Sequence, residues 1–137
     1  MPLTQAHPPG KLLVFVYGTL RRGLPHHGLL ASARYLGPAR TKSPYALYVA
    51  DFPRVVPNEA VSLIHGELYL VDNYTLALLD DLEDHPFVYE RRQVSVIMDD
   101  GSETAAWIYF HPRQEGFLIP HGDLVAWLRD RHEDELR

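Results

Sequence analysis

Four carboxylates crowd into one short stretch of the sequence, LDDLEDHPFVY. Asp80, Asp81, Glu83 and Asp84 stand beside an apolar and aromatic run at 87–89. Mutual repulsion and partial burial both disfavour the charged form of a carboxyl group, so this setting can raise one pKa into the range of a general base. Taken alone, the stretch is more typical of an acidic face exposed to water.

A glycine turn, FVYGTLRRG, is the second candidate for chemistry. Gly18 has no Cβ where an apolar run ends, so consecutive backbone N–H groups beyond it can point into one cavity and bind an anion or oxyanion. Because the phosphate-loop pattern GxxxxGK[ST] is missing, the turn alone is more typical of a plain tight turn. Arg21 and Arg22 do not decide the question, since adjacent arginines usually face different surroundings and stay solvated.

Other kinds of catalytic and metal site have little support. The eight histidines form no HxxxH or HExxH pattern, and adjacent His26 and His27 do not easily bind one ion, so we expect no metal site. No serine lies in a GxSxG elbow. The absence of cysteine excludes disulfides, thiolate zinc sites and cysteine nucleophiles, and it fits a reducing compartment, so we expect a cytoplasmic protein.

Length and composition indicate one domain. A chain of 137 residues with 46% hydrophobic content can close a single core, which we expect at 12–137 after a flexible lead-in at 1–11. A formal net charge of -5 argues against a nucleic-acid partner. No run reaches the roughly 18 apolar residues that span a bilayer, so no membrane partner is expected. The sequence leaves the oligomeric state open.

Short strands and helices must position the candidate groups. Apolar and β-branched runs predict strands at 12–16, 44–50, 62–71, 88–98 and 103–110, joined at 51–60 by a proline-punctuated connection. Segments 26–34, 73–82 and 124–137 are predicted helices; the last is capped within 121–123 and buries Leu124, Trp127, Leu128 and Leu136. Strands do not alternate regularly with long helices. This predicts a small mixed α/β (α+β) domain with a curved, barrel-like mixed sheet flanked by short helices.

The predicted helix at 73–82 places the acidic stretch. Asp72 is its expected N-cap, and leucines at 76, 79 and 82 share one face that should pack on the core. Pro86 disfavours helical backbone at the residue before it, so the chain must turn there. Glu83 and Asp84 are therefore expected at the helix end.

Four motifs in order, VFVYGTLRRG, HGELYLVD, LDDLEDHPFVYERR and AAWIYF, resemble the gamma-glutamylcyclotransferase-like family, and the YGTL form is most similar to its gamma-glutamylamine cyclotransferase branch. The likeness extends from about Leu13 to Phe110. It implies a barrel-like sheet with a cavity floored by the YGTL turn. It also implies an enzyme that converts a small gamma-glutamyl amine or amide into 5-oxoproline and a released amine or amino acid, with no metal or organic cofactor.

The resemblance also assigns roles residue by residue. Glu83 matches the catalytic carboxylate of the family and is expected to act as general acid and base. The positions whose backbone holds the α-carboxylate end of the gamma-glutamyl group are Tyr17, Gly18, Thr19 and Leu20. Supporting positions at the cavity are Tyr89, Arg91 and Tyr109.

Two departures from the family pattern leave the substrate open. Asp84 follows Glu83 where the family often has Gly, and His26 stands where it often has Asn. An extra acid beside Glu83 can shift its pKa or shape the exit for the leaving group. A binding module that keeps the pocket for a small carboxylate ligand is the alternative to a cyclotransferase, and a transferase or hydrolase acting on gamma-glutamyl metabolites is a third.

Overall fold

The computed structural model describes residues 10–135, with side chains to residue 132. The predicted lead-in at 1–11 lies almost wholly outside the described residues, as does Leu136. The strands are β1 (Lys11–Val16), β2 (Arg34–Thr41), β3 (Ala46–Val49), β4 (Pro53–Val56), β5 (His65–Asp72), β6 (Glu90–Met98), β7 (Glu103–Phe110) and β8 (Phe117–Ile119). The helices are the 3₁₀ helix η1 (His27–Leu30), α1 (Asn73–Glu83) and α2 (Leu124–Glu135).

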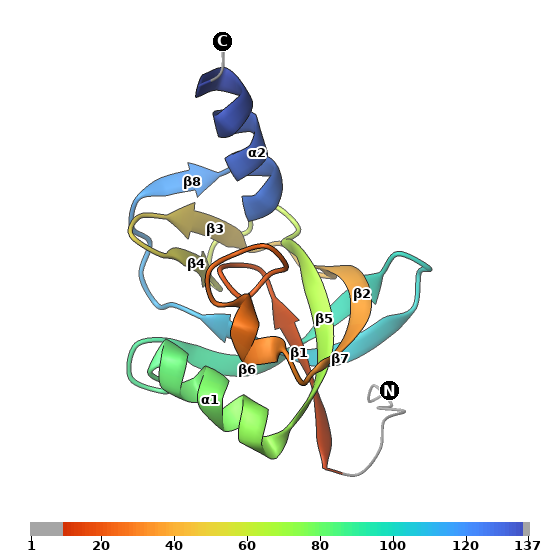
Figure 1. The fold of residues 1–137 in the computed structure, drawn as a ribbon. Helices are drawn as coiled ribbons and strands as arrows, with labels where there is room; N and C mark the ends of the chain where they lie inside the picture. The colour runs from red at the N-terminus through yellow and green to blue at the C-terminus, as the bar shows by residue number, and fades with distance from the viewer. Residues whose placement is uncertain (1–9, 136–137) are drawn as a thin grey trace.

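Five strands close into a barrel, which confirms the predicted barrel-like mixed sheet. They follow the order β1-β5-β2-β6-β7, and a parallel pairing of Val14 with Trp107 joins β7 back to β1. Beyond β7 the sheet continues through β4 and β3 to β8. Figure 1 shows α1 and α2 at opposite ends of the domain. Within residues 10–135, no helix has the length and apolar character needed to cross a membrane.

The apolar strand β1 is buried on both faces, as its unbroken hydrophobic run predicts. Leu13 and Phe15 pack into the main core inside the barrel. Val14 and Val16 face a second core, which Leu76 of α1 joins. Because successive side chains of a strand point to opposite faces, one strand organises both cores. The C-terminal end of β1, where the glycine turn begins, is therefore fixed by packing against both cores.

Helix α1 begins as predicted but uses its leucines differently. The Asp72 carboxylate accepts a hydrogen bond from the N–H of Thr75 at 2.7 Å, and this bond lowers the pKa of Asp72. Leu76 and Leu79 are buried in the second core. The prediction for Leu82 is wrong, because its side chain is 36% exposed and lines a cavity. The position lies at the end of the helix, where the underlying sheet no longer covers it.

The end of α1 confirms the predicted placement of the two acids. Glu83 is the last helical residue, and Asp84 adopts a left-handed backbone with φ of 51°. The N–H of His85 donates to the carbonyl of Asp80 at 2.9 Å. This type of C-terminal cap ends the helix before Pro86.

Three strands lie where the sequence predicts no strand. β2 begins at Arg34, the last residue of the predicted helix, whose helical part is limited to η1. A register shift between Tyr35 and Gly37 interrupts the β2 pattern. β4 occupies the predicted proline-punctuated connection, and β8 is three residues long. β2 and β8 form by pairing with strands distant in the sequence, which a local pattern does not reveal. β4 pairs mainly with its neighbour β3, and the prolines of the segment obscure its pattern.

Helix α2 is capped as predicted, by Asp123, whose carboxylate accepts from the N–H of Ala126 at 3.2 Å. Leu124 is buried and Trp127 packs against the main core. Leu128 does not pack as predicted, since it is 38% exposed. Residues 128–132, further along α2, are exposed.

Candidate active site

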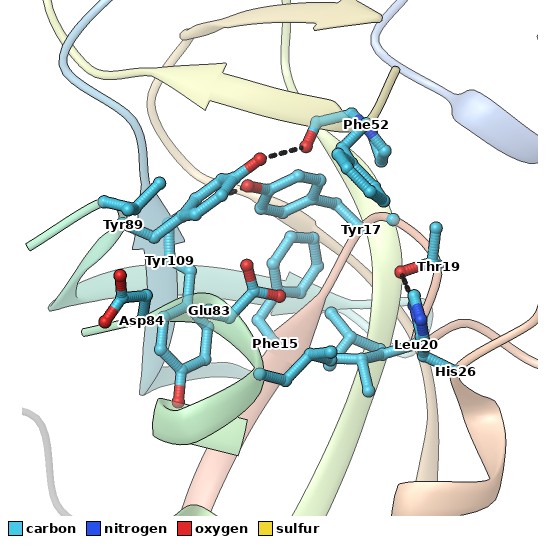
Figure 2. Close-up of a pocket in the computed structure, with 15 residues that line it drawn as sticks. Phe15, Tyr17, Thr19, Leu20, His26, Phe52, Glu83, Asp84, Tyr89 and Tyr109 are labelled. Atoms are coloured by element: carbon cyan, nitrogen blue, oxygen red, sulfur yellow. Dashed lines mark hydrogen bonds between the residues drawn. The ribbon is translucent and has the colours of Figure 1, made fainter. Parts of the chain in front are cut away.

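A cavity of about 360 Å³ lies where the C-terminal end of β1 meets the C-terminal end of α1 (Figure 2). Its size is within the range of small-molecule sites. It brings together the glycine turn, the acidic helix end and two tyrosines from other strands and loops. The lining residues are Phe15, Val16, Tyr17, Gly18, Thr19, Leu20, His26, Phe52, Pro53, Leu82, Glu83, Asp84, Val88, Tyr89 and Tyr109.

The glycine turn forms one wall of the cavity. A Cβ at Gly18 would lie 2.8 Å from Cγ of Pro53, so only glycine lets the two segments approach this closely. The turn is closed by a 3.0 Å hydrogen bond from the N–H of Arg21 to the carbonyl of Gly18. Among the described residues, none accepts a hydrogen bond from the N–H groups of Gly18, Thr19 or Leu20. Consecutive N–H groups without an acceptor can bind an anion when they point into one cavity.

Glu83 lies between the tyrosines and the glycine turn (Figure 2). Burial raises the pKa of its carboxyl group from 4.5 to about 7. No described residue donates a hydrogen bond to that carboxyl group. The sequence suggested repulsion among neighbouring acids as a further cause, but burial alone accounts for the shift. A carboxyl group with this pKa is present near neutral pH in both protonation states, so it can take up and return a proton.

The three predicted tyrosines line the cavity, but their hydroxyl groups are already bonded. Tyr17 donates to the backbone carbonyl of Tyr109 at 2.6 Å. Tyr89 donates to the carbonyl of Pro53 at 2.9 Å, and Tyr109 donates to Asp80 at 2.6 Å. Burial raises the pKa of Tyr89 to about 12, and it also raises the pKa of Tyr17 and of Tyr109. These hydroxyls stay protonated, and their bonds hold the aromatic walls in place.

Arg91 lies outside the cavity lining, unlike the other predicted site residues. Its Nε bonds to the Asp80 carboxylate at 2.9 Å, and its guanidinium stacks over the Trp107 ring at 4.3 Å. The same Asp80 oxygen accepts the hydroxyl of Tyr109. Arg91 therefore supports the cavity wall from behind, through Asp80 and through its strand pairing with Tyr109. The sequence did not predict the link through Asp80.

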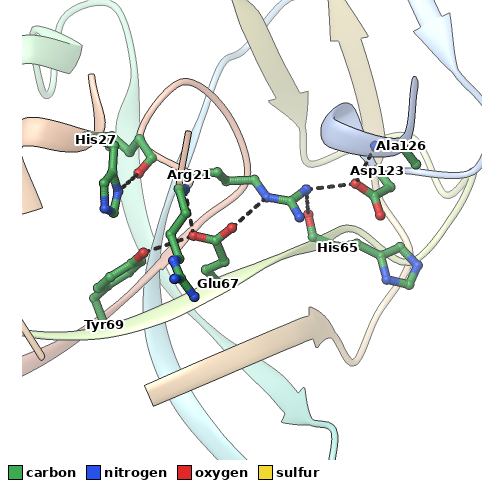
Figure 3. Close-up of polar contacts among 9 residues, drawn as sticks. Arg21, His27, His65, Glu67, Tyr69, Asp123 and Ala126 are labelled. Carbon is green, nitrogen blue, oxygen red and sulfur yellow. Dashed lines mark hydrogen bonds and ion pairs between the residues drawn. The ribbon is translucent and has the colours of Figure 1, made fainter. Parts of the chain in front are cut away.

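A buried ionic network supports the turn from behind (Figure 3). The Glu67 carboxylate accepts from Arg21 Nε at 3.2 Å, from the backbone N–H of Arg22 at 2.9 Å and from the Tyr69 hydroxyl at 2.9 Å. Arg21 also pairs with Asp123 at 2.8 Å. Its side chain is only 11% exposed, so the expectation that both arginines are solvated is wrong for Arg21. The network ties the turn to β5 and to the start of α2.

Replacing Glu67 with Gln is expected to lower the free energy of unfolding by about 1–3 kcal/mol. The substitution removes the negative charge that faces the buried Arg21 guanidinium, and it turns one of the two accepting oxygens into an NH2 donor that faces another donor. Urea denaturation measures this change. Glu103→Gln is the matched control, since Glu103 pairs with the exposed Lys42 and its loss should cost less than about 0.5 kcal/mol. Equal small losses in the two variants would contradict a supporting role for Glu67.

Sequence reasoning missed several residues that line the cavity. Phe52 and Pro53 come from the segment predicted as a plain connection, and Val88 from the start of a predicted strand. The sequence contained only a weak signal for them, an aromatic residue beside a proline. Among the side chains of residues 10–132, no cluster of three or more His, Asp or Glu has the arrangement of a metal site.

The chain matches the sequence profile described as "Gamma-glutamyl cyclotransferase, AIG2-like" over residues 14–129. It belongs to this gamma-glutamyl cyclotransferase family. The matched region includes the glycine turn, the acidic helix end and all three cavity tyrosines. The resemblance seen in the sequence motifs is thereby confirmed at the level of the family.

Relatives in this gamma-glutamyl cyclotransferase family include proteins of differing names. A Methanocaldococcus jannaschii protein named "Putative gamma-glutamylcyclotransferase" is 48% identical over 111 residues, covering 80% of this chain and 92% of its own. The human "Gamma-glutamylaminecyclotransferase" is 39% identical over 134 residues, covering 81% and 87%. The crystal structure of an AIG2-like protein from Mus musculus superimposes with a TM-score of 0.73 at 28% identity, covering 82% of this chain and 87% of that one.

Proposed function

We propose that this protein is a cyclotransferase that acts on a gamma-glutamyl amine or amide and releases 5-oxoproline and an amine. One observation carries the proposal: the carboxyl group of Glu83, with a pKa of about 7 and no described polar partner, shares a cavity with the unpaired N–H groups of the glycine turn. Gamma-glutamyl cyclisation needs one proton-transfer group and one anion-binding wall; in this proposal Glu83 is the first and the glycine turn is the second.

In the proposed reaction the substrate attacks itself. The Glu83 carboxylate takes a proton from the α-ammonium group, and the freed amine attacks the γ-carbonyl carbon to form the ring C–N bond. The protonated Glu83 then gives its proton to the leaving nitrogen, and the old amide C–N bond breaks. Glu83 next removes the extra proton from the ring nitrogen, which restores a neutral lactam, and this proton passes to the released amine. No external nucleophile and no cofactor takes part.

The turn has a binding role in this proposal. The N–H groups of Gly18, Thr19 and Leu20 are fixed by the folded chain, so they can hold the α-carboxylate or the developing oxyanion without reorganising. The substrate is then bent so that its amine lies close to its γ-carbonyl, and this proximity lowers the barrier further. The aromatic walls of Tyr17 and Tyr109 limit the access of water.

We further propose that the leaving group is an amine of the kind that the amine branch releases. The supporting observations are the YGTL form of the turn and the 39% identity to the human gamma-glutamylaminecyclotransferase.

Product analysis tests the proposal. The protein is incubated with gamma-glutamyl amino acids, gamma-glutamyl alkylamines and gamma-glutamyl-ε-lysine, and mass spectrometry follows 5-oxoproline, free glutamate and the released amine. We expect 5-oxoproline and amine in equal amounts, with loss of both in the Glu83→Gln variant. Free glutamate instead of 5-oxoproline would indicate a hydrolase. Ligand affinity without any product, unchanged in the variant, would indicate a binding module.

A further inference from the structure

The mouth of the cavity is apolar and open to solvent. Three large apolar side chains of the lining are exposed: Phe52 at 58%, Val88 at 43% and Leu82 at 36%. Phe52 lies in the connection between β3 and β4, while Leu82 and Val88 flank the loop after α1. These three side chains border the cavity, yet much of their apolar surface remains in contact with water. A ligand that extends out of the cavity is able to cover them.

Charge at the mouth is acidic. Glu83 and Asp84 line the cavity, whereas no lysine or arginine does so among the described residues. His26 is the one basic lining side chain, and its Nδ1 is bonded to the Thr19 hydroxyl at 2.7 Å. Figure 2 shows His26 beside Leu20, across the view from Asp84. Within the described part of the chain, no lysine or arginine therefore lines the mouth next to Asp84, and the adjacent His85 lies outside the lining, where its Nδ1 accepts from the N–H of Arg91.

The guanidinium groups of the nearby arginines pair with other carboxylates, and the one Arg54 nitrogen without a hydrogen-bond partner among the described residues, Nε, is buried. Arg54 pairs with Glu115 at 3.1 Å, and its side chain is 12% exposed. Arg91 pairs with Asp80 at 2.9 Å. A carboxylate on the leaving group would thus approach Asp84 without a matching cation, and partial removal from water would strengthen the repulsion.

We infer that the leaving group is an apolar amine without a carboxylate, an alkyl or arylalkyl amine whose chain lies against Phe52, Leu82 and Val88. The inference rests on the proposed function. Proton exchange with Glu83 places the leaving nitrogen beside that residue, and the chain attached to the nitrogen must run from there to solvent. The apolar mouth lies on that route, and covering it removes apolar surface from water.

Four gamma-glutamyl amides test the inference, because they share one five-carbon chain. The leaving amines are pentylamine, 1,5-diaminopentane, 6-aminohexanoate and the ε-amine of lysine, which add to the chain nothing, an ammonium, a carboxylate, or both. We expect the pentylamine compound to have the highest kcat/KM. Each compound with a carboxylate should be at least about tenfold poorer than its partner without one.

Phe52→Ala separates the apolar contact from the chemistry. It is expected to lower kcat/KM for the pentylamine compound by about five- to tenfold, and to leave gamma-glutamylmethylamine, whose chain is too short to reach the mouth, nearly unchanged. Phe117→Ala is the matched control, because Phe117 is 73% exposed on β8 and lies outside the cavity lining. Phe117→Ala should leave kcat/KM unchanged for both substrates.

Asp84→Asn tests the charge, and asparagine suits the left-handed backbone at this position. In this variant, the kcat/KM of the 6-aminohexanoate compound should come closer to that of the pentylamine compound. Three results would overturn the inference without contradicting the proposed cyclotransferase activity. They are an equal kcat/KM for these two compounds in the wild type, a higher kcat/KM for the diamine compound than for the pentylamine compound, and an equal loss of kcat/KM for the methylamine and pentylamine compounds in Phe52→Ala. Absence of 5-oxoproline from all the compounds would overturn the proposed function itself, and the inference with it.

Discussion

Glu83→Gln is expected to lower kcat at pH 7 by about 10²–10⁴-fold, the usual contribution of a positioned proton-transfer group. Glutamine has the shape of glutamate but neither takes nor gives a proton. In the wild type, kcat/KM should fall about tenfold per pH unit below pH 7, because protonation of Glu83 removes the base whose pKa is about 7. Initial rates from pH 5 to 8, with the best gamma-glutamyl substrate, measure both effects.

Stability against pH is the control for this variant. The pKa of Glu83 is about 7 when folded and 4.5 when freely solvated, so folding favours the protonated acid. The wild type therefore loses stability as the pH rises from 4.5 through 7, by about 1–3 kcal/mol, and Glu83→Gln does not. Thermal unfolding should show that the stability of the variant relative to the wild type increases between pH 5 and pH 8. A fully active variant, or one that is less stable at pH 8, would contradict the role of Glu83.

Gly66→Ala is expected to destabilise the fold by more than about 4 kcal/mol, an exceptional loss for a single methyl group. A Cβ at Gly66 would lie 2.2 Å from the carbonyl oxygen of Val16 and 2.8 Å from Cζ of Phe15. The backbone oxygen is held where β1 and β5 pair, so it has no room to move aside. Val16 directly precedes the turn, so displacing β1 also displaces the cavity wall.

The matched control is Gly28→Ala in η1, since a Cβ there would meet no atom within 4 Å. That variant should differ from the wild type by less than about 0.5 kcal/mol. Soluble yield and chemical denaturation of both variants measure the contrast. A Gly66→Ala protein as stable as Gly28→Ala would show that β1 and β5 separate easily, against the close approach described here.

Parts of the candidate site could be predicted because their signals are local. Gly18 ends an apolar run, and the acids at 83 and 84 follow a helix that a proline must end. The partner of Tyr109 could not be predicted in this way. Asp80 lies 29 positions before Tyr109 in the sequence. Only the packing of α1 beside β7 brings its carboxylate oxygen to 2.6 Å from the Tyr109 hydroxyl.

The same distinction holds for the fold. The unbroken apolar run of β1 and the helical spacing of leucines in α1 are strong local patterns, and the structure confirms both elements. β2 carries Gly37 and Pro38, which obscure its pattern, and it becomes a strand through pairing with β5 and β6. Local propensity does not include these distant partners, so it misses the strand.

The sequence by itself determined that the chain forms one small mixed α/β domain, that it resembles gamma-glutamyl cyclotransferases, and that Glu83 stands at a helix end. These follow from composition, hydrophobic periodicity and motif order, which are properties of neighbouring residues. Only the tertiary structure decided that Glu83 is buried enough for a pKa of about 7, that Arg91 lies behind the cavity wall, and that Phe52 reaches the mouth. Burial and contact depend on chain segments far apart in sequence, and barrel closure brings those segments together.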